Sequence, residues 1–156
     1  MGQAPSARVH AGRTPWSDDS GDRLRAWTGL AKDEFYDPAK VALLSMGFCY
    51  PGGRSGGDLP PRPECAPLWH PRIMALLPPG RLTLLVGTYA QKAYLKLPKD
   101  ATLTETVRAF DSHGPDLFPL PHPAWRSMLW MKRNPWFEQD VLPALRSRVR
   151  ALLEVA

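Results

Sequence analysis

The chain has 156 residues, a formal net charge of +5 and a pI of about 9.5. This length is typical of one domain with a buried core, so we expect residues 1–156 to form a single, monomeric domain. No apolar stretch approaches the ~18 residues of a membrane helix and no secretory signal opens the chain, which excludes a membrane partner and favours a reducing, cytoplasmic location. The basic charge favours a polyanionic partner.

Cysteine content limits the metal chemistry. Cys49 and Cys65 are the only cysteines, and two thiols cannot ligate an iron–sulfur cluster by themselves. Together with His70 they supply three potential zinc ligands, but their spacing matches no known zinc pattern. We therefore expect no metal and no cofactor.

The N-terminal residues Met1–Pro5 contain the glycine and proline of a turn. In α/β domains such a turn normally follows a strand, and functional sites lie at the carboxyl ends of these strands. We therefore expect that a first strand is missing ahead of the turn. Residues Arg8–Ser17 are predicted to form a basic loop.

A short helix is predicted over Gly21–Trp27, with Ser20 or Asp19 as its N-cap. The segment Phe35–Asp37 is interpreted as a linker that ends at Pro38.

The apolar run Val41–Met46 is predicted to be a strand that is covered on both faces. The glycine- and proline-rich segment Gly47–Pro63 is predicted to be a long loop, which in a compact domain is usually functional or disordered. A helix is predicted over Glu64–Leu77 because apolar residues recur at helical spacing: Leu68, Trp69, Ile73, Leu76 and Leu77.

The second half of the chain alternates strands with helices. Arg81–Gly87 and Phe118–Leu120 are predicted strands, while Thr88–Leu95, Thr102–Phe110 and Leu142–Val155 are predicted helices, the last with its leucines inward and its arginines outward. This alternation predicts a three-layer α/β/α fold with a short central parallel sheet.

His122 lies between two prolines, Pro121 and Pro123. Proline fixes its own φ angle and restricts the residue before it, so the imidazole has little backbone freedom and can be aimed. Aromatic and basic residues follow it, and these residue types insert into and clamp nucleic acids. The alternative is a proline-rich turn with a surface histidine.

Four segments are predicted to meet at the carboxyl edge of the sheet: Gly2–Ser20, Gly47–Asp58, Gly87–Tyr89 and His122–Arg126. Each carries polar or aromatic side chains, so we expect them to form one cleft.

The order of several short motifs resembles the uracil-DNA glycosylase superfamily, most closely its bacterial fourth and fifth families. The segments that carry the resemblance are Gly2–Pro5, Gly12–Asp22, Cys49–Cys65, Pro119–Pro123 and Asn134–Val149. Together they extend over nearly the whole chain. The four cysteines of the iron–sulfur cluster in the fourth family are absent here.

The resemblance implies a DNA-repair enzyme that cleaves the N-glycosidic bond of uracil in DNA and leaves an abasic site, with other deaminated bases left open as further substrates. It also implies a monofunctional hydrolase with DNA, single- or double-stranded, as its partner. The base has to leave the stack and enter a pocket.

The resemblance assigns roles to several residues at that pocket. His122 matches the donor to O2 of the departing uracil, and Trp16 matches the aromatic residue that stacks on the base. Gln3 and Ala4 belong to the first motif, beside the base. Ala4 stands where many members of the family carry an acid or amide.

The acid that is absent at Ala4 has two candidate substitutes. Asp18 matches an acid of the fifth family by position, and Asp19 is second. Either could stabilise an oxocarbenium-like sugar or orient water. The alternative for both is helix capping, because aspartate is a preferred cap residue.

The uracil-reading asparagine of the family aligns best with Asp58. A carboxylate accepts from uracil N3–H but cannot donate to O4, so selectivity for uracil over cytosine is open. The alternative is a solvated turn residue.

DNA contacts are expected outside the pocket. Trp125 and Arg126 match the minor-groove wedge of the family, and Lys132 and Arg133 are expected at phosphates. Tyr89, with Gln91 and Lys92, is predicted to bind a phosphate at a helix N-terminus. The alternatives are a surface aromatic residue and solvated turns.

A misplaced start, in which an internal valine codon was read as the initiator, is one hypothesis for the missing strand; a stop codon just upstream of Met1 would exclude it. If the chain is complete, two unpaired strand edges predict low solubility and poor activity.

The alternative function is a catalytically weak or inactive binder of damaged or abasic DNA. A third is a generic α/β domain of unrelated activity.

Overall fold

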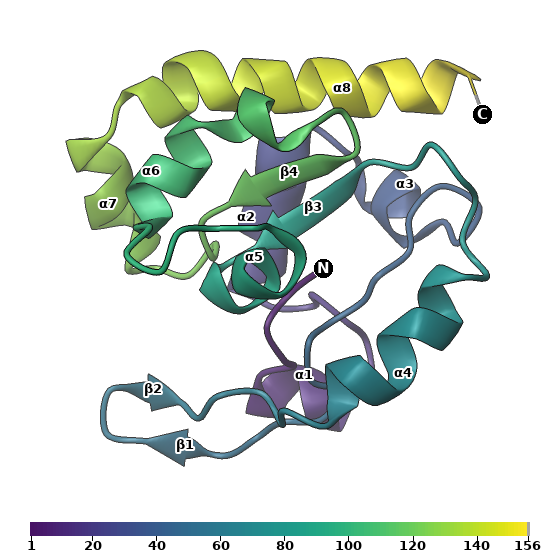
Figure 1. Ribbon diagram of the computed structural model, residues 1–156. Helices are drawn as coiled ribbons and strands as arrows, with labels where there is room; N and C mark the ends of the chain where they lie inside the picture. Colours follow the sequence, from purple (N-terminus) through teal and green to yellow (C-terminus); the bar gives the residue numbers. More distant parts are fainter. Residues whose placement is uncertain (156) are drawn as a thin grey trace.

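The computed structural model describes residues 1–155 and contains short helices around a small parallel sheet (Figure 1). The strands are β1 (Gly53–Arg54), β2 (Gly57–Asp58), β3 (Thr83–Val86) and β4 (Leu117–Leu120). The helices are α1 (Ala7–Gly12), α2 (Asp19–Thr28), α3 (Lys32–Tyr36), α4 (Cys65–Met74), α5 (Thr88–Tyr94), α6 (Leu103–Arg108), α7 (Ser127–Arg133) and α8 (Leu142–Val155), with a 3-10 turn at Phe110–His113 and a π-helical turn at Phe137–Val141. None of the described helices has the length and apolar character needed to cross a membrane.

The sheet is built around β3. On one side β3 pairs in parallel with β4, with Leu84 opposite Phe118. On its other side lie Met1–Gln3: the Met1 nitrogen donates to the Leu84 carbonyl at 2.7 Å, and the Val86 N–H donates to the Met1 carbonyl at 2.9 Å. Gly2 in turn forms a parallel bridge with Ser45. The N-terminal residues therefore lie between β3 and the segment around Ser45.

The predicted strand Val41–Met46 is wrong, because only a single bridge forms at Ser45. Its backbone hydrogen bonds to the N-terminal residues Gly2 and Gln3 come from Leu44–Gly47 alone, and Val41 instead donates to the Asp37 carbonyl in a turn. A strand exists through its ladder of partners, and an apolar run alone cannot supply them.

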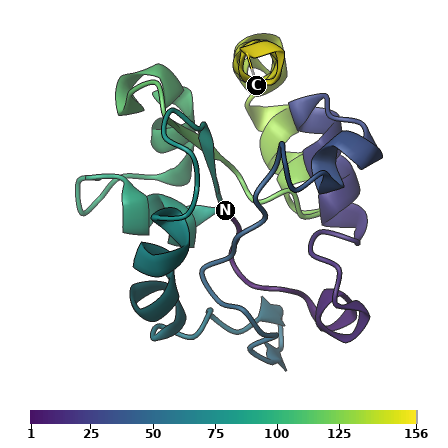
Figure 2. The same cartoon turned by 90° about the vertical axis from the view of Figure 1, so that its right-hand side faces the viewer.

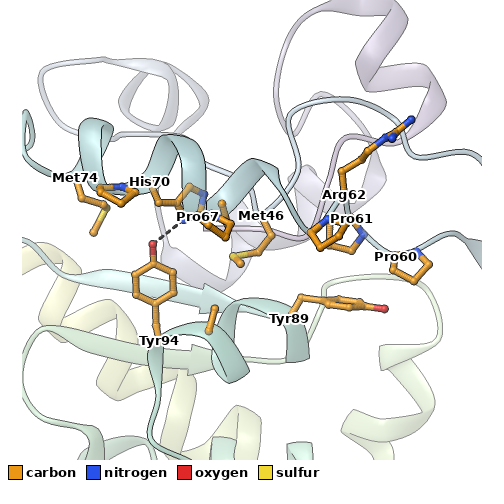
Figure 3. Close-up of a pocket in the computed structure, with 13 residues that line it drawn as sticks. Met46, Pro60, Pro61, Arg62, Pro67, His70, Met74, Tyr89 and Tyr94 are labelled. Atoms are coloured by element: carbon orange, nitrogen blue, oxygen red, sulfur yellow. Dashed lines mark hydrogen bonds between the residues drawn. The ribbon is translucent and has the colours of Figure 1, made fainter.

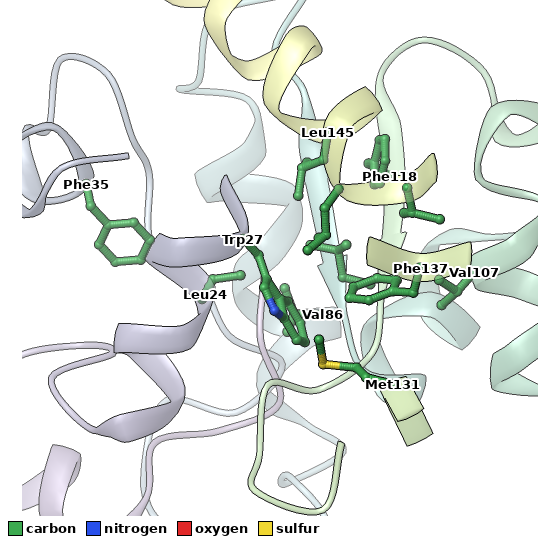
Figure 4. Close-up of a cluster of buried hydrophobic side chains, with 12 residues drawn as sticks. Leu24, Trp27, Phe35, Val86, Val107, Phe118, Met131, Phe137 and Leu145 are labelled. Atoms are coloured by element: carbon green, nitrogen blue, oxygen red, sulfur yellow. The ribbon is translucent and has the colours of Figure 1, made fainter. Parts of the chain in front are cut away.

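Helices cover both faces of the sheet, as predicted for a three-layer α/β/α fold. Figure 2 shows α2 and α3 on one side of the strands, and α4, α5 and α6 on the other. Successive strand residues face opposite layers. Leu85 packs with Ala90 and Leu95 of the α5 layer, whereas Val86 packs with α2, α8 and the π-helical turn; in this second cluster the Trp27 and Phe137 rings meet edge-on at 5.1 Å (Figure 4).

The predictions for β3, β4, α5, α6 and α8 are confirmed within a few residues. Arg148 of α8 was expected to point outward, but its guanidinium lies 5.3 Å from the centroid of the Phe118 ring. The helical apolar pattern over Glu64–Leu77 does not mark a buried face, since Leu68 and Trp69 of α4 and Leu76 just beyond it are 54%, 45% and 85% exposed.

Other elements were not predicted. The expected basic loop contains α1, which begins after the N-cap Ser6, and the expected linker at Phe35 is α3, anchored by the buried Phe35 ring. The N-cap of α2 is Asp18 rather than Ser20 or Asp19. Within the long loop Gly47–Pro63, β1 and β2 form a small hairpin.

Candidate active site

A cavity of about 1220 Å³ lies at the carboxyl ends of β3 and β4. All four segments that were predicted to converge contribute to its lining. The predicted site residues that line it are Gln3, Ala4, Trp16, Asp18, Asp58, His122, Trp125 and Arg126. The prediction that these four segments form one cleft is therefore confirmed.

Trp16 is held on one side of this cavity by a tight turn. Its backbone has a φ of 58°, a conformation that is uncommon for a bulky residue. A Cβ atom on Gly21 would lie 1.7 Å from the Trp16 carbonyl oxygen, and one on Gly2 would lie 2.5 Å from its ring. Tyr36 also donates a hydrogen bond to the Trp16 carbonyl at 3.0 Å. Gly2 thus lets the indole lie close to the main chain, and Gly21 lets the backbone of the turn lie close to α2.

His122 follows the end of β4, and its loop is fixed by main-chain hydrogen bonds. The Ser127 hydroxyl donates to the His122 carbonyl, and Arg23 of α2 donates to the carbonyl of Pro123. Just before it, Leu120 accepts hydrogen bonds at 2.8 Å from the Gly87 N–H and from Nε2 of Gln91. The imidazole is therefore aimed by contacts to its backbone.

The electrostatic surroundings of His122 favour the neutral imidazole. Burial lowers the pKa of His122, and the negative charges of Asp18 and Asp58 oppose this effect without cancelling it. Its ring lies 6.0 Å from the Trp16 ring, with the planes tilted by 34°. Near neutral pH the cavity thus presents a neutral imidazole next to an indole.

Asp18 combines a structural contact with a place in the cavity. One carboxylate oxygen accepts from the Gly21 N–H at 3.1 Å and caps α2, and the other accepts from the Ser6 hydroxyl at 3.0 Å. Ser6 itself caps α1 through Val9. The capping alternative is thus correct for Asp18, and the carboxylate also lines the cavity.

Asp19 does not line the cavity: it is the first residue of α2 and is exposed. Because Asp18 occupies the cap position, the chain turns into the helix there and Asp19 lies on its outer side. Its predicted place at the pocket is wrong.

The hairpin β1–β2 and the loop after His122 frame the mouth of the cavity. Asp58, on β2, is exposed but lines the cavity. Trp125 is 69% exposed and Arg126 lies over its ring, 5.4 Å from the centroid. Arg126 also lies near Gly57 at the hairpin. These side chains are accessible to a ligand as large as DNA.

Three predicted DNA contacts lie outside this cavity. Lys132 and Arg133 are exposed in the last turn of α7, and Tyr89 lines a separate cavity between α4 and α5. Gln91 was grouped with Tyr89 as a phosphate ligand, but this is wrong, because its buried amide donates to the carbonyls of Leu85 and Leu120.

Sequence reasoning missed several residues that line the cavity: Ser6, Val9, His10, Arg13, Phe48, Thr88 and Ser127. Most lie in or beside elements that were not predicted, above all α1. A serine at position 6 followed by helix-compatible residues is the one signal that could have located that helix.

The lining combines a neutral imidazole, a carboxylate and an indole around a space large enough for a nucleotide. Within residues 1–155, no three His, Cys, Asp or Glu side chains are grouped to hold a metal ion, and both cysteines are free.

The family model described as "Uracil DNA glycosylase superfamily" matches residues 1–146.

Proposed function

The chain belongs to the uracil DNA glycosylase superfamily, and on that premise we propose that it hydrolyses the N-glycosidic bond of uracil in DNA, leaving an abasic site. The observation that carries the proposal is that His122, Asp18 and Trp16 open onto one cavity. Trp16 and Asp18 come from the N-terminal part of the chain and His122 from the C-terminal part. Together they supply the stacking surface, the carboxylate and the hydrogen-bond donor that this reaction needs.

Trp16 provides the surface on which an extruded base would stack. A base can react only after it leaves the duplex stack, and an aromatic face partly replaces the stacking that is lost. The close approach of its ring to Gly2 and of its backbone to Gly21 restricts Trp16 before the base arrives, so little ordering is needed on binding.

His122 would stabilise the leaving group. As the bond between C1′ and N1 breaks, its electron pair moves to the uracil ring and negative charge develops on O2. A neutral imidazole N–H aimed at O2 stabilises this charge without giving up its proton. The lowered pKa of His122 keeps the imidazole neutral near pH 7.

Asp18 would act on the sugar. Its carboxylate can stabilise the positive charge that develops at C1′ and can orient a water molecule for attack there. The water oxygen bonds to C1′, and its proton passes to the carboxylate or to solvent. The hydroxyl of Ser6 and the N–H of Gly21 hold the carboxylate in place.

Asp58, Gln3 and the loop after His122 would recognise the substrate. Asp58 can accept from uracil N3–H, and Gln3 and Ala4, which line the cavity, would lie close to the base. Trp125 and Arg126 would enter the space left by the flipped nucleotide, and Lys132 and Arg133 would contact phosphates.

The test is a duplex oligonucleotide with one uracil, treated with alkali to cut abasic sites. We expect the protein to generate product, and His122→Ala and Asp18→Asn to lower the rate about 10²- to 10³-fold. Asparagine still caps α2, so Asp18→Asn preserves the fold. Asp19→Asn is the matched control. An equal loss in Asp19→Asn, or full activity in His122→Ala, would contradict the proposal.

A second candidate function is binding of damaged or abasic DNA without cleavage. It is favoured by Ala4, which lines the cavity where related enzymes carry an acid or amide. Tight binding of an abasic duplex together with no uracil release by the unmodified protein would support this candidate.

A further inference from the structure

A second cavity lies between α4 and α5, and the reaction proposed above does not use it. Its volume is about 790 Å³. Figure 3 shows Pro60, Pro61, Arg62 and α4 along one wall, α5 along the other, and Met46 between them. We call it the α4–α5 groove, defined by Met46, Pro60–Pro63, His70, Met74, Tyr89 and Tyr94.

The groove is a direct neighbour of the catalytic cavity. Gly47 and Thr88 line the cavity, whereas Met46 and Tyr89, the adjacent residues on the same two segments, line the groove. Adjacent Cα atoms are about 3.8 Å apart. The cavity and the groove therefore adjoin along these two segments, which is the arrangement that two neighbouring nucleotides of one strand would need.

The inner end of the groove is fixed by a buried histidine. His70 is 4% exposed, and its two ring nitrogens lie 2.9 Å from the Ser45 carbonyl and 2.6 Å from the Tyr94 hydroxyl. A carbonyl oxygen only accepts, so Nε2 carries a proton and donates to Ser45, while Nδ1 pairs with the Tyr94 hydroxyl. Figure 3 marks the contact with Tyr94. The groove is thus formed in advance of any ligand.

The lining suits a nucleobase with its phosphate. Prolines and methionines make the walls apolar, and Tyr89 is 39% exposed. Arg62 is exposed, and none of the lining residues is acidic. Aromatic rings stack on any base, and an arginine at the mouth attracts the backbone.

We propose that the α4–α5 groove binds the base of a nucleotide that flanks the flipped uracil in single-stranded DNA, with the base stacked on Tyr89 and Arg62 near its phosphate. This subsite rests on the proposed function. It requires a single strand, since a base within a duplex is unavailable for stacking on protein. It gives the protein a site for a second nucleotide next to the reacting one.

The test measures binding of single-stranded oligonucleotides that contain 2′-fluoro-2′-deoxyuridine, which resists cleavage. In two further oligonucleotides, the base on the 5′ or the 3′ side of the uracil is replaced by an abasic analogue. For the unmodified protein we expect about tenfold weaker binding when the base on one particular side is removed. Tyr89→Ala should bind the intact oligonucleotide about tenfold more weakly and show no further loss with the abasic one.

Trp69→Ala is the matched control, because Trp69 is an exposed aromatic residue of α4 that does not line the groove. If Tyr89→Ala shows the same loss on base removal as the unmodified protein, the subsite is overturned and the apolar walls fit a protein partner instead. Uracil release is measured in parallel. Release without an effect of Tyr89 overturns the subsite alone, whereas Tyr89-dependent binding without release supports the subsite and contradicts the catalytic proposal.

Discussion

At the scale of single residues, the environment of His122 determines how activity should depend on pH. Burial lowers its pKa below the ordinary histidine value of about 6.5. We therefore expect uracil release to be constant from pH 8 to 6.5, and to fall about tenfold per pH unit below the folded pKa, where the imidazole becomes charged. The rate profile, with an NMR titration of His122, measures this.

The lowered pKa of His122 should also make the folded protein less stable as the pH falls. The unfolded chain binds a proton at His122 at a higher pH than the folded protein does. The free energy of unfolding should therefore fall as the pH drops through the interval between the unfolded and the folded pKa, and His122 should contribute no change above it. Asp58→Asn should lower the pKa of His122 further, whereas Asp19→Asn should not. A folded pKa above 6.5 would contradict the neutral imidazole.

At the scale of elements, helix α2 packs so closely under the turn at Trp16 that this contact leaves no room for a larger side chain. A Cβ atom on Gly21 would meet the Trp16 carbonyl at 1.7 Å, a distance that requires the turn or the helix to move. We expect Gly21→Ala to lower the free energy of unfolding by about 3 kcal/mol or more and to abolish uracil release, because Trp16 and Asp18 flank this contact. Thermal unfolding and the oligonucleotide assay measure both effects.

Gly12 at the end of α1 provides the matched control, since a Cβ atom there meets nothing within 4 Å. Gly12→Ala should leave stability unchanged or raise it by up to about 1 kcal/mol. If both alanine variants were equally stable, the Trp16 turn would not depend on this close approach.

The elements also show where sequence patterns are informative. The strand and helix from Arg81 to Leu95 were predictable because an apolar run, a glycine and a helical pattern follow one another there. The apolar residues of α4 predicted the helix but not its exposure, because periodicity identifies an apolar stripe but not what it faces. In α4 the buried side chain is His70, whose two polar partners, Tyr94 and the Ser45 carbonyl, come from other segments.

At the scale of the whole molecule, the convergence of the site was predictable from topology. Parallel strands end at one edge, so the loops after them meet there whatever their sequences are. The pairing of Met1–Gln3 with β3 and Ser45 was not predictable, because these residues carry no strand pattern and are held by backbone hydrogen bonds from both sides. Whether Asp18 or Asp19 lies at the cavity likewise depends on which of the two residues begins α2. Composition alone does not decide this.

Over the whole DNA-binding surface, the number of phosphates that the protein contacts should determine how salt affects DNA binding. Each phosphate contact releases counterions, so the logarithm of the binding constant falls linearly with the logarithm of the salt concentration. Lys132 and Arg133 are exposed on α7, the helix that follows Trp125 and Arg126. If both side chains contact phosphates, the double variant Lys132→Ala/Arg133→Ala should bind uracil-containing duplex more weakly and reduce the slope by about 2.

Lys40→Ala is the control for this measurement, because Lys40 already pairs with Asp37 at 3.6 Å and lies outside both cavities. It removes the charge of one lysine without removing a proposed DNA contact, so its slope should match that of the unmodified protein. Equal slopes in the double variant and the unmodified protein would place the DNA away from α7. The basic residues of α7 would then serve solubility alone, and the loop at Trp125 would have to contact DNA without support from the helix that follows it.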